Sequence, residues 1–266
     1  MSDQLNLFEE EDNSKRIKIG QASVAYKDVS SILTKASGFM KSYDYSLNPY
    51  SGCSFGCTYC YAAFFSRNKE KVDNWGYWVE AKENALRLLV KKRKRPMKGT
   101  KIYMSSVTDP YQPIEKELEL TRSILKELLD YHEVRLVIQT RAGLVKRDID
   151  LLKKFETLQV NMTITTDSEK IRKAFEPYCP SNKIRLDAIK EIHNAGIQSC
   201  ITMTPLLPIE KPVQFATDLK ETGIEKFIIQ PFHSNKGKFV RGTRAEALKL
   251  LEEYNWNDEE LSLIHI

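Results

Sequence analysis

The sequence predicts an α/β protein built around a parallel sheet. Three observations lead to this prediction. Apolar runs rich in β-branched residues alternate with amphipathic stretches, six such runs occur, and the 266 residues suffice for one sizeable domain. Six strands are too few for a closed barrel of eight β/α units. We therefore expect a single core in which strands alternate with helices.

The predicted elements follow from hydrophobic periodicity. The six apolar runs predict strands at Ser46–Tyr50, Lys101–Ser105, Arg135–Gln139, Gln159–Thr165, Gln198–Met203 and Lys226–Gln230. Helical spacing of apolar residues predicts helices at Leu120–Tyr131 and Ile184–Ala195, and near Tyr77–Lys92, Asp148–Phe155, Val213–Thr222 and Arg244–Glu253. Gly196 supplies a stop signal after the second of these helices. The last residues, 261–266, are compatible with a final strand or a truncated continuation.

Two regions of different composition divide the chain. Residues 1–36 are polar and contain the acidic run Glu9–Asp12, so we expect a flexible N-terminal arm before a core domain at residues 37–266 that ends with the helix near Arg244–Glu253. Within the arm, Gln4-Leu5-Asn6-Leu7-Phe8 is similar to the peptide by which bacterial DNA-processing proteins bind the replication sliding clamp. The alternatives are a chance match or an apolar patch that folds back on its own domain.

Composition limits the compartment and the partners. Apolar residues make up 41% and charged residues 29%, which is ordinary for a globular protein. No apolar run approaches the ~18 residues of a membrane span, and the start of the chain lacks the features of a signal peptide. Five cysteines, three of them clustered, fit a reducing compartment. We expect a cytoplasmic protein with no membrane contact. The net charge of +5 permits an anionic partner without requiring one.

Three cysteines, Cys53, Cys57 and Cys60, lie within eight residues and predict a metal centre. Thiolates are soft ligands that select zinc, copper(I) or iron-sulfur clusters. A closed zinc site needs a second ligand pair nearby, and a ferredoxin cluster needs a fourth cysteine. The two remaining cysteines, Cys179 and Cys200, stand far away in the sequence. The pattern therefore supplies three ligands and leaves a fourth position open.

The Cys-x3-Cys-x2-Cys spacing resembles the radical S-adenosylmethionine (SAM) superfamily. Its flanking residues Asn48–Gly52 and Thr58–Tyr61, together with Thr108–Pro113 and Arg147–Leu152, are similar to the spore photoproduct lyase-like branch. The resemblance implies an open, partial (β/α)6 barrel of the TIM type. It also implies that the three cysteines hold a [4Fe-4S] cluster whose fourth iron binds SAM, and that reductive cleavage of SAM gives a 5'-deoxyadenosyl radical.

The resemblance further implies site residues on the loops at the carboxyl ends of the strands. Tyr59 and Tyr61 match positions that line the SAM and radical site, with aromatic packing around the cluster as the alternative. Ser106 stands where a photoproduct lyase would carry a hydrogen-donor cysteine, and its O–H is too poor a hydrogen-atom donor to replace it. Thr108 or Asp109 occupies the position of a turn that contacts the SAM amine, although Asp109-Pro110 is also a common turn dipeptide.

Further candidates lie at the ends of later strands. Arg141, where the family often has lysine, is expected to bind the SAM carboxylate, unless it is a solvated charge at the strand end. Thr163 and Thr165 face the same side of their predicted strand, where one of them would bond the ribose, or both are ordinary strand formers. We expect Cys200 to pack in the core and Cys179, between two prolines, to lie in a loop; a redox or hydrogen-donating thiol is the alternative for one of them.

The basic run Lys91–Arg95 is either a solvated cap at a helix end or a phosphate-binding patch for nucleic acid. The leading hypothesis is thus a radical SAM enzyme, reduced by a donor such as flavodoxin or ferredoxin, that acts on nucleic acid. Two other classes stay open. One is a non-catalytic iron-sulfur or zinc protein, and the other is a nucleic-acid or sliding-clamp adaptor with a structural metal.

Overall fold

The computed structural model describes residues 15–232 and 242–254. The clamp-like peptide Gln4–Phe8 and the tail 261–266 lie outside these ranges. Among the described residues, no helix combines the length and the apolar character that crossing a membrane requires.

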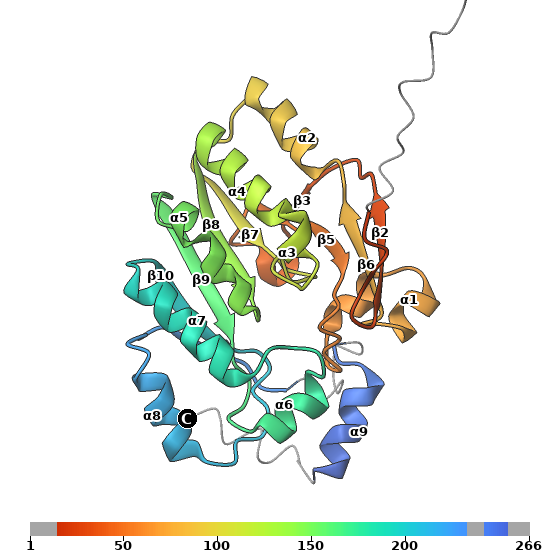
Figure 1. Cartoon of the computed structure of the whole chain (residues 1–266), viewed down its shortest axis with the longest axis vertical. Helices are drawn as coiled ribbons and strands as arrows, with labels where there is room; N and C mark the ends of the chain where they lie inside the picture. Colours follow the sequence, from red (N-terminus) through yellow and green to blue (C-terminus); the bar gives the residue numbers. More distant parts are fainter. Residues whose placement is uncertain (1–14, 233–241, 255–266) are drawn as a thin grey trace, which may run out of the picture.

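The described elements form two sheets with helices packed on them (Figure 1). The strands are β1 (Lys18–Ile19), β2 (Ala22–Lys27), β3 (Leu33–Lys35), β4 (Tyr45–Leu47), β5 (Tyr50–Gly52), β6 (Trp78–Lys82), β7 (Thr100–Met104), β8 (Val134–Thr140), β9 (Thr157–Thr163), β10 (Gln198–Met203) and β11 (Phe227–Ile229). The α-helices are α1 (Lys69–Asp73), α2 (Ala85–Lys91), α3 (Glu115–Leu118), α4 (Leu120–Tyr131), α5 (Ile149–Leu152), α6 (Glu169–Phe175), α7 (Asn182–Asn194), α8 (Pro212–Lys220) and α9 (Ala245–Glu253). Four 3-10 helices complete the described list: η1 (Gly38–Met40), η2 (Tyr61–Phe65), η3 (Lys92–Lys94) and η4 (Gly143–Asp148).

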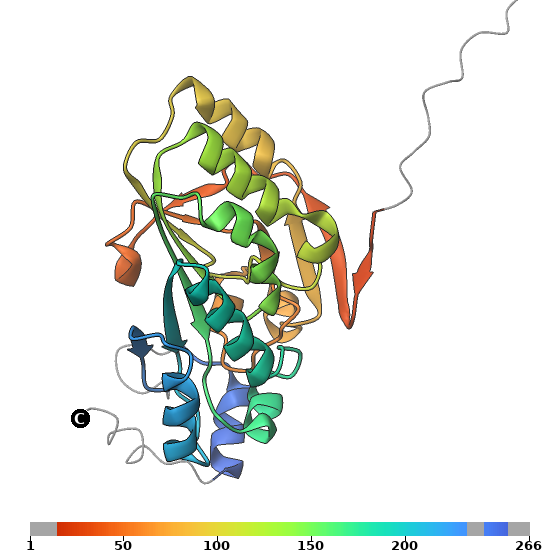
Figure 2. The ribbon, with the colours of Figure 1, turned by 60° about the vertical axis from the view of Figure 1, so that its left-hand side comes forward.

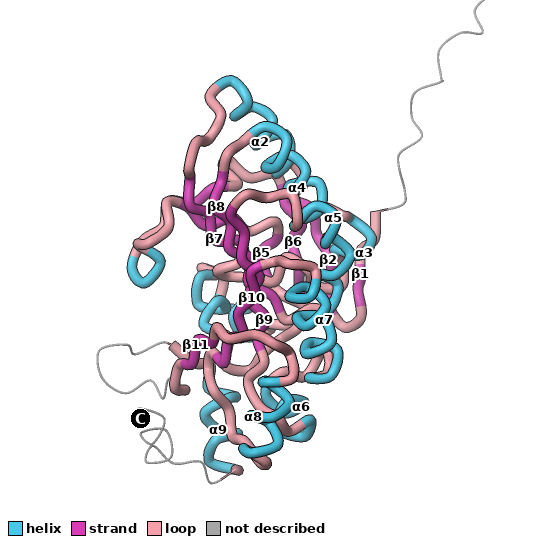
Figure 3. Tube along the Cα trace, turned by 90° about the vertical axis from the view of Figure 1, so that its left-hand side faces the viewer, coloured by secondary structure: helices cyan, strands magenta, loops and turns pink. Residues whose placement is uncertain are grey.

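The main sheet has the strand order β11-β10-β9-β8-β7-β4-β3. Its strands from β4 to β11 pair in parallel, and β3 adds an antiparallel edge. The six parallel strands coincide with the six predicted ones, apart from shifts at their ends. Because the order is linear, the described sheet is open, which confirms the predicted α/β fold with a partial barrel. Helices α2, α4, α5 and α7 cover one face of this sheet (Figure 3).

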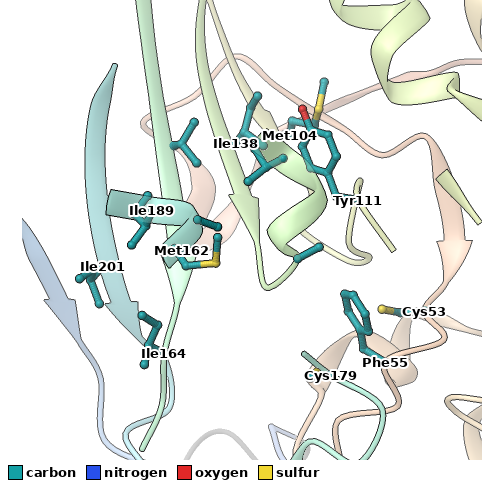
Figure 4. Packing of buried hydrophobic residues seen from close by; sticks show 14 of the residues in the cluster. Cys53, Phe55, Met104, Tyr111, Ile138, Met162, Ile164, Cys179, Ile189 and Ile201 are labelled. Carbon is teal, nitrogen blue, oxygen red and sulfur yellow. The ribbon is translucent and has the colours of Figure 1, made fainter. Parts of the chain in front are cut away.

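The core fills the space between this sheet and its helices. Fully buried side chains from neighbouring strands, such as Ile102, Ile138 and Val160, meet Leu125 and Ile189 from the helices. The predicted helix at Leu120–Tyr131 forms with these bounds because its apolar residues share one face. Figure 4 shows Cys53, Phe55 and Cys179 grouped at the border of this apolar cluster.

A second sheet, which the sequence did not predict, has the order β1-β2-β6-β5. It corrects the prediction of an unpacked arm, because within residues 15–36 the β2 residue Ala22 and the nearby Ile32 are almost fully buried, 0% and 2% exposed. β2 pairs in parallel with β6, a contact between segments more than fifty residues apart that local composition does not reveal. Figure 2 shows these first strands along one side of the molecule.

Three predicted elements differ in detail. The helix expected near Tyr77–Lys92 begins only at Ala85, because residues 78–82 form β6. The helix expected at Asp148–Phe155 is α-helical only over Ile149–Leu152. The first predicted strand is divided between the two sheets, with β4 in the main sheet and β5 in the small one. The chain passes from the main sheet to the small one between β4 and β5, and the cysteine loop follows β5 within the connection to β6.

Candidate functional site

The cysteine loop begins directly after β5 and is shaped by two glycines. Gly52 has a φ of +73°, and a Cβ added there would lie 2.6 Å from the Trp78 ring. Gly56 has a φ of +60° and packs on Gly76, where an added Cβ would lie 2.7 Å from the Gly56 Cα. Only glycine adopts these conformations without strain in such close packing. The two glycines thus restrict the backbone conformation of the loop between β5 and η2.

The three cysteines of this loop lie in a sheltered environment. Cys53 and Cys57 are buried, and Cys60 is half-buried. Burial raises the pKa of Cys53 well above its usual range and that of Cys60 to about 11. The contact with the Cys179 thiol is the main cause that lowers the pKa of Cys57. Metal binding at Cys53 and Cys60 would therefore release protons.

The fourth cysteine of this region was not expected at the site. Cys179 lies in a loop, as predicted, but it is buried and its Sγ is 3.6 Å from that of Cys57. Cys200 is fully buried in β10, which confirms its prediction as a core residue. Within the described parts of the chain, no three His, Cys, Asp or Glu side chains converge closely enough to hold one metal ion. The three thiols suit an iron-sulfur cluster, which is larger than a single metal ion and is held by cysteine thiolates.

A buried carboxylate, Glu176, joins the cysteine loop to two arginines. Its Oε1 accepts hydrogen bonds from the Tyr59 hydroxyl and, at 3.0 Å, from Thr165 Oγ1. The same oxygen lies 3.5 Å from Arg141 Nε, and Oε2 lies 2.5 Å from Arg185 Nη2. Burial alone would raise the pKa of Glu176, but Arg185, Arg141 and the Tyr59 hydroxyl outweigh it and lower the pKa to about 2. The carboxylate is therefore ionised at neutral pH.

Arg141 has an unpaired hydrogen-bond donor in this network. It follows the end of β8, and its Nη2 donates to the Tyr59 hydroxyl at 3.1 Å. Its Nε is buried and makes no hydrogen bond with any described residue, since the contact with Glu176 is an ion pair without hydrogen-bond geometry. Buried N–H groups are rarely left unpaired. A guanidinium in this state is suited to an anionic ligand group.

Asp109 connects the loop after β7 to the end of β8. Its Oδ1 accepts from Thr140 Oγ1 at 2.7 Å and from the Tyr111 N–H at 2.9 Å, and its Oδ2 accepts from the Arg141 N–H at 2.7 Å. Burial raises the pKa of Asp109, and these hydrogen bonds oppose that rise. Both carboxylate oxygens are thus engaged with the protein. In this arrangement Asp109 positions the backbone of Arg141.

The loop after β7 is also tied to the cysteine loop. Ser105 has a φ of +83°, rare for a residue with a side chain, and its hydroxyl donates to the Thr108 carbonyl. Thr108 Oγ1 donates to the Gly52 carbonyl at 2.6 Å, and the Tyr61 hydroxyl donates to the Ser106 carbonyl. Backbone strain of this kind is concentrated at functional loops. Ser106 itself is half-buried, and its Oγ accepts from Asn48 Nδ2 at 3.3 Å.

The two predicted threonines, Thr163 and Thr165, belong to different hydrogen-bond networks. Thr165 lies just beyond β9, is fully buried and bonds Glu176, so it belongs to the Arg141 network. Thr163 lies at the end of β9 and bonds Gln139 at 2.5 Å and Thr202 at 3.0 Å, within a row of polar side chains across neighbouring strands. The structure therefore brings Thr165, with Tyr59 and Arg141, around one carboxylate and leaves Thr163 in a separate set.

Glu176 and Arg185 escaped the prediction, and Cys179 was predicted as a loop residue, with a redox or hydrogen-donating thiol as the alternative. A signal for Arg185 was present, because it is spaced three, four and seven residues before Ala188, Ile189 and Ile192, on the buried face of α7. A charge on such a face needs a buried partner. No periodicity marks Glu176 or Cys179, which lie in the irregular segment after α6.

Comparison with known proteins assigns the chain to a family. The model of the Radical SAM superfamily matches residues 47–221, from the end of β4 to just past α8. The chain belongs to the radical SAM superfamily. This membership confirms the resemblance inferred from the cysteine spacing, and the superfamily is one of enzymes.

Solved structures of radical SAM enzymes share the fold. A spore photoproduct lyase variant with bound AdoMet and dinucleoside spore photoproduct has a TM-score of 0.57 and 18% identity, covering 77% of this chain and 60% of its own. Streptococcus suis SuiB bound to the precursor peptide SuiA has a TM-score of 0.51 and 16% identity, covering 79% of this chain and 44% of its own. At these identities the likeness concerns the fold.

Relatives in sequence are nearer. An uncharacterised protein of Methanocaldococcus jannaschii is 43% identical over 164 residues, which are 62% of this chain and 61% of the relative. A radical SAM Nalpha-GlyT isomerase of Pseudomonas phage M6 is 26% identical over 161 residues, 60% of this chain and 32% of the relative. The matched region thus spans about three fifths or less of the length of these relatives.

Proposed function

We propose that this protein is a radical SAM enzyme that binds a [4Fe-4S] cluster through Cys53, Cys57 and Cys60 and cleaves SAM reductively. One observation carries the proposal: the three-cysteine loop and the guanidinium of Arg141, which has an unpaired buried N–H, meet through Tyr59 at one edge of the sheet. When bound, the cluster supplies the electron that cleaves the sulfonium of SAM to give a 5'-deoxyadenosyl radical.

The residues of the chain have separate roles in this proposal. Arg141 binds the SAM carboxylate as a permanent cation, and Glu176 with Asp109 holds its side chain and its backbone in place. Tyr59 covers the cluster side of the site and orients the guanidinium through its hydroxyl. Tyr61 fixes the loop that contains Ser106. Thr108, which bonds Gly52, connects that loop to the cysteines.

We propose nucleic acid as the substrate class. Support comes from the dinucleoside photoproduct bound to a protein of the same fold, and from exposed basic residues on this chain such as the run Lys91–Arg95. We do not assign the photoproduct lyase reaction, because Ser106 occupies the position of the expected donor thiol. A flavodoxin or ferredoxin as reductant, a cytoplasmic location and clamp binding through Gln4–Phe8 complete the proposal.

Anaerobic reconstitution with iron and sulfide tests the cofactor assignment. We expect about four irons per chain and release of 5'-deoxyadenosine from SAM after reduction with dithionite. Replacing Cys53, Cys57 and Cys60 by alanine should abolish both, while Cys200→Ala, a buried cysteine remote in sequence, should preserve both. One tightly bound zinc with no deoxyadenosine would instead establish a structural metal module. Partner binding that survives loss of all three cysteines would favour an adaptor.

A further inference from the structure

The small sheet has one buried and one open face. Val79 and Ala81 of β6 are 1% and 2% exposed and pack with Tyr50 and Ile114 in a separate apolar cluster. The alternate β6 residues, among them Trp78 and Glu80, are only partly buried and point to the other face, because side chains along a strand alternate. Trp78 packs against the main core, so this second face is covered in part, and β5, β6 and α1 lie around it (Figure 1).

A pocket of about 380 Å³ lies over this open face. Its lining includes Ser51 and Trp78 from the small sheet, and Phe65, Arg67 and Lys71 from η2, the segment that follows it and α1. This volume is within the range of small-molecule sites, about 300–1,000 Å³. We call it the Trp78 pocket.

The Trp78 pocket presents aromatic surface, and a buried unpaired donor lies behind its lining. Phe65 is 66% exposed, an unusual fraction for a phenylalanine, and it contacts Tyr61 edge-on at 6.0 Å between ring centroids. Trp75, which also lines the pocket, is 4% exposed, and its Nε1 has no hydrogen-bond partner in the described chain. A buried indole N–H normally finds an acceptor. The exposed ring of Phe65 points to a ligand with a flat apolar face.

The charge of the lining is positive. Lys27, Arg67 and Lys71 contribute three cations against one carboxylate, that of Glu80. Lys71 pairs with Glu80 and lies over the Trp78 ring, 4.7 Å from its centroid. Lys27 and Arg67 are exposed and form no ion pair within residues 15–232 and 242–254. These two cations are available to an anionic ligand such as a phosphate.

The pocket adjoins the cysteine loop. Its lining includes Gly52 and Ala62, which flank the loop on both sides, and Val107 from the loop after β7. Gly52 accepts the hydrogen bond from Thr108 that connects those two loops. A ligand in the pocket therefore lies beside the proposed reaction site, and a polymer bound there passes close to it.

We infer that the Trp78 pocket binds one unstacked nucleotide of a single-stranded nucleic acid, next to the nucleotide that reacts. The base stacks on Phe65, and the phosphates meet Lys27 and Arg67. Aromatic stacking combined with cations along the backbone is the general means of binding single strands without sequence preference. This inference rests on the proposed function and specifies where its substrate class binds.

The basic run at Lys91–Arg95 lies near the amino-terminal ends of the strands of the main sheet, opposite the carboxyl ends. It ends α2 and forms η3 before β7 begins, whereas Val107 follows β7. The five residues of β7 separate the two positions by about 17 Å. Within the run, Arg93 is engaged with Glu127 at 2.7 and 2.5 Å and stacks on Tyr131 at 3.4 Å. The run is therefore a charge-matched control for the pocket.

Fluorescence anisotropy of a labelled 12-nucleotide single strand, titrated with the full chain at about 0.1 M salt, tests the inference. Lys27→Glu combined with Arg67→Glu is expected to weaken binding at least tenfold, and Phe65→Ala about tenfold. Lys92→Glu combined with Lys94→Glu makes the same change in net charge and should weaken binding less than threefold. Equal losses for the two double variants would overturn the inference, as would unchanged binding by the pocket variants.

Tryptophan fluorescence gives a direct readout of the site. The chain has three tryptophans, so in a Trp256→Phe background the emission comes from Trp75 and Trp78 alone. The single strand should quench this emission and a duplex of the same sequence should quench it less. An acidic peptide that quenches equally would assign the pocket to a protein partner and overturn the inference.

The outcome is separable from that of the proposed function. Strand binding is measured without turnover, and deoxyadenosine release is measured without a strand. Strand binding at the pocket by a chain that cannot cleave SAM would contradict only the proposal that the protein is a radical SAM enzyme. SAM cleavage by a chain that binds no strand would contradict only the inference that the Trp78 pocket binds a nucleotide.

Discussion

Two buried glutamates, Glu115 and Glu176, organise two polar networks of opposite character. Glu115 accepts from the Tyr50 hydroxyl at 2.5 Å, from Arg147 Nη2 at 2.7 Å and from the backbone N–H groups of Thr121 and Arg122 at 2.8 and 3.2 Å. Each of its oxygens thus has two donors. The partners come from β5, α4 and η4, so this network fixes elements of the scaffold to one another.

The network of Glu176 is left incomplete. Its Oε2 pairs with Arg185 at 2.5 Å, but the Nε of Arg141, 3.5 Å from Oε1, is buried without a hydrogen-bond partner in the described ranges. Fully satisfied networks rigidify a fold, whereas unsatisfied groups mark places where a ligand contributes. Burial and charge occur in both networks, so the unpaired N–H of Arg141 beside the cysteine loop is the observation that distinguishes the candidate site.

The largest effect expected is on stability, from Glu115→Ala. Removing this buried carboxylate leaves the Tyr50 hydroxyl and the N–H groups of Thr121 and Arg122 without an acceptor, although Arg147 keeps its pair with Asp148. We expect a loss of about 3–5 kcal/mol in the free energy of unfolding, measured by urea denaturation. Iron content and SAM binding of the folded fraction should stay unchanged. Glu191→Ala, which removes an exposed pair with Lys146, should cost no more than about 1 kcal/mol. A loss of SAM binding in folded Glu115→Ala protein would break the contrast between the networks.

Glu176→Gln should cost about 3 kcal/mol at pH 7, because the pKa of Glu176 is about 2 in the folded protein against an ordinary value of 4.5. A lowered carboxyl pKa contributes stability that is complete above pH 4.5 and is lost as the pH falls toward 2. The difference in unfolding free energy between wild type and variant should therefore shrink across this window. A difference that stays constant from pH 6 to pH 3 would contradict the prediction.

Arg141→Lys should act on ligand binding more than on folding. Lysine keeps the charge and loses the planar set of donors, so we expect the Kd for SAM, measured by calorimetry on the reconstituted protein, to rise about tenfold, or about 1.4 kcal/mol. The matched variant Arg147→Lys, in the Glu115 network, should lower stability and leave the Kd unchanged. Equal Kd values for the two variants would remove Arg141 from the SAM site.

Cys179→Ser should have the smallest effect. Its thiol contacts Cys57 at 3.6 Å but is not one of the three clustered cysteines, so reconstituted iron content should change by less than about a tenth and stability by less than about 1 kcal/mol. Cys57→Ser should lose most of the iron. If Cys179→Ser loses iron to the same extent, Cys179 is a ligand and the three-cysteine assignment is wrong.

The sequence by itself determined the six parallel strands, the helix Leu120–Tyr131 and the family, because periodicity and the spacing of Cys53, Cys57 and Cys60 are local properties of the chain. Tertiary structure alone decided the small sheet and the Glu176 network. β2 and β6 pair across more than fifty residues, and Glu176 meets Tyr59 across 117 residues of sequence. Such contacts depend on which faces the folded core brings together, and a buried charge reveals its role only when its partners are in place.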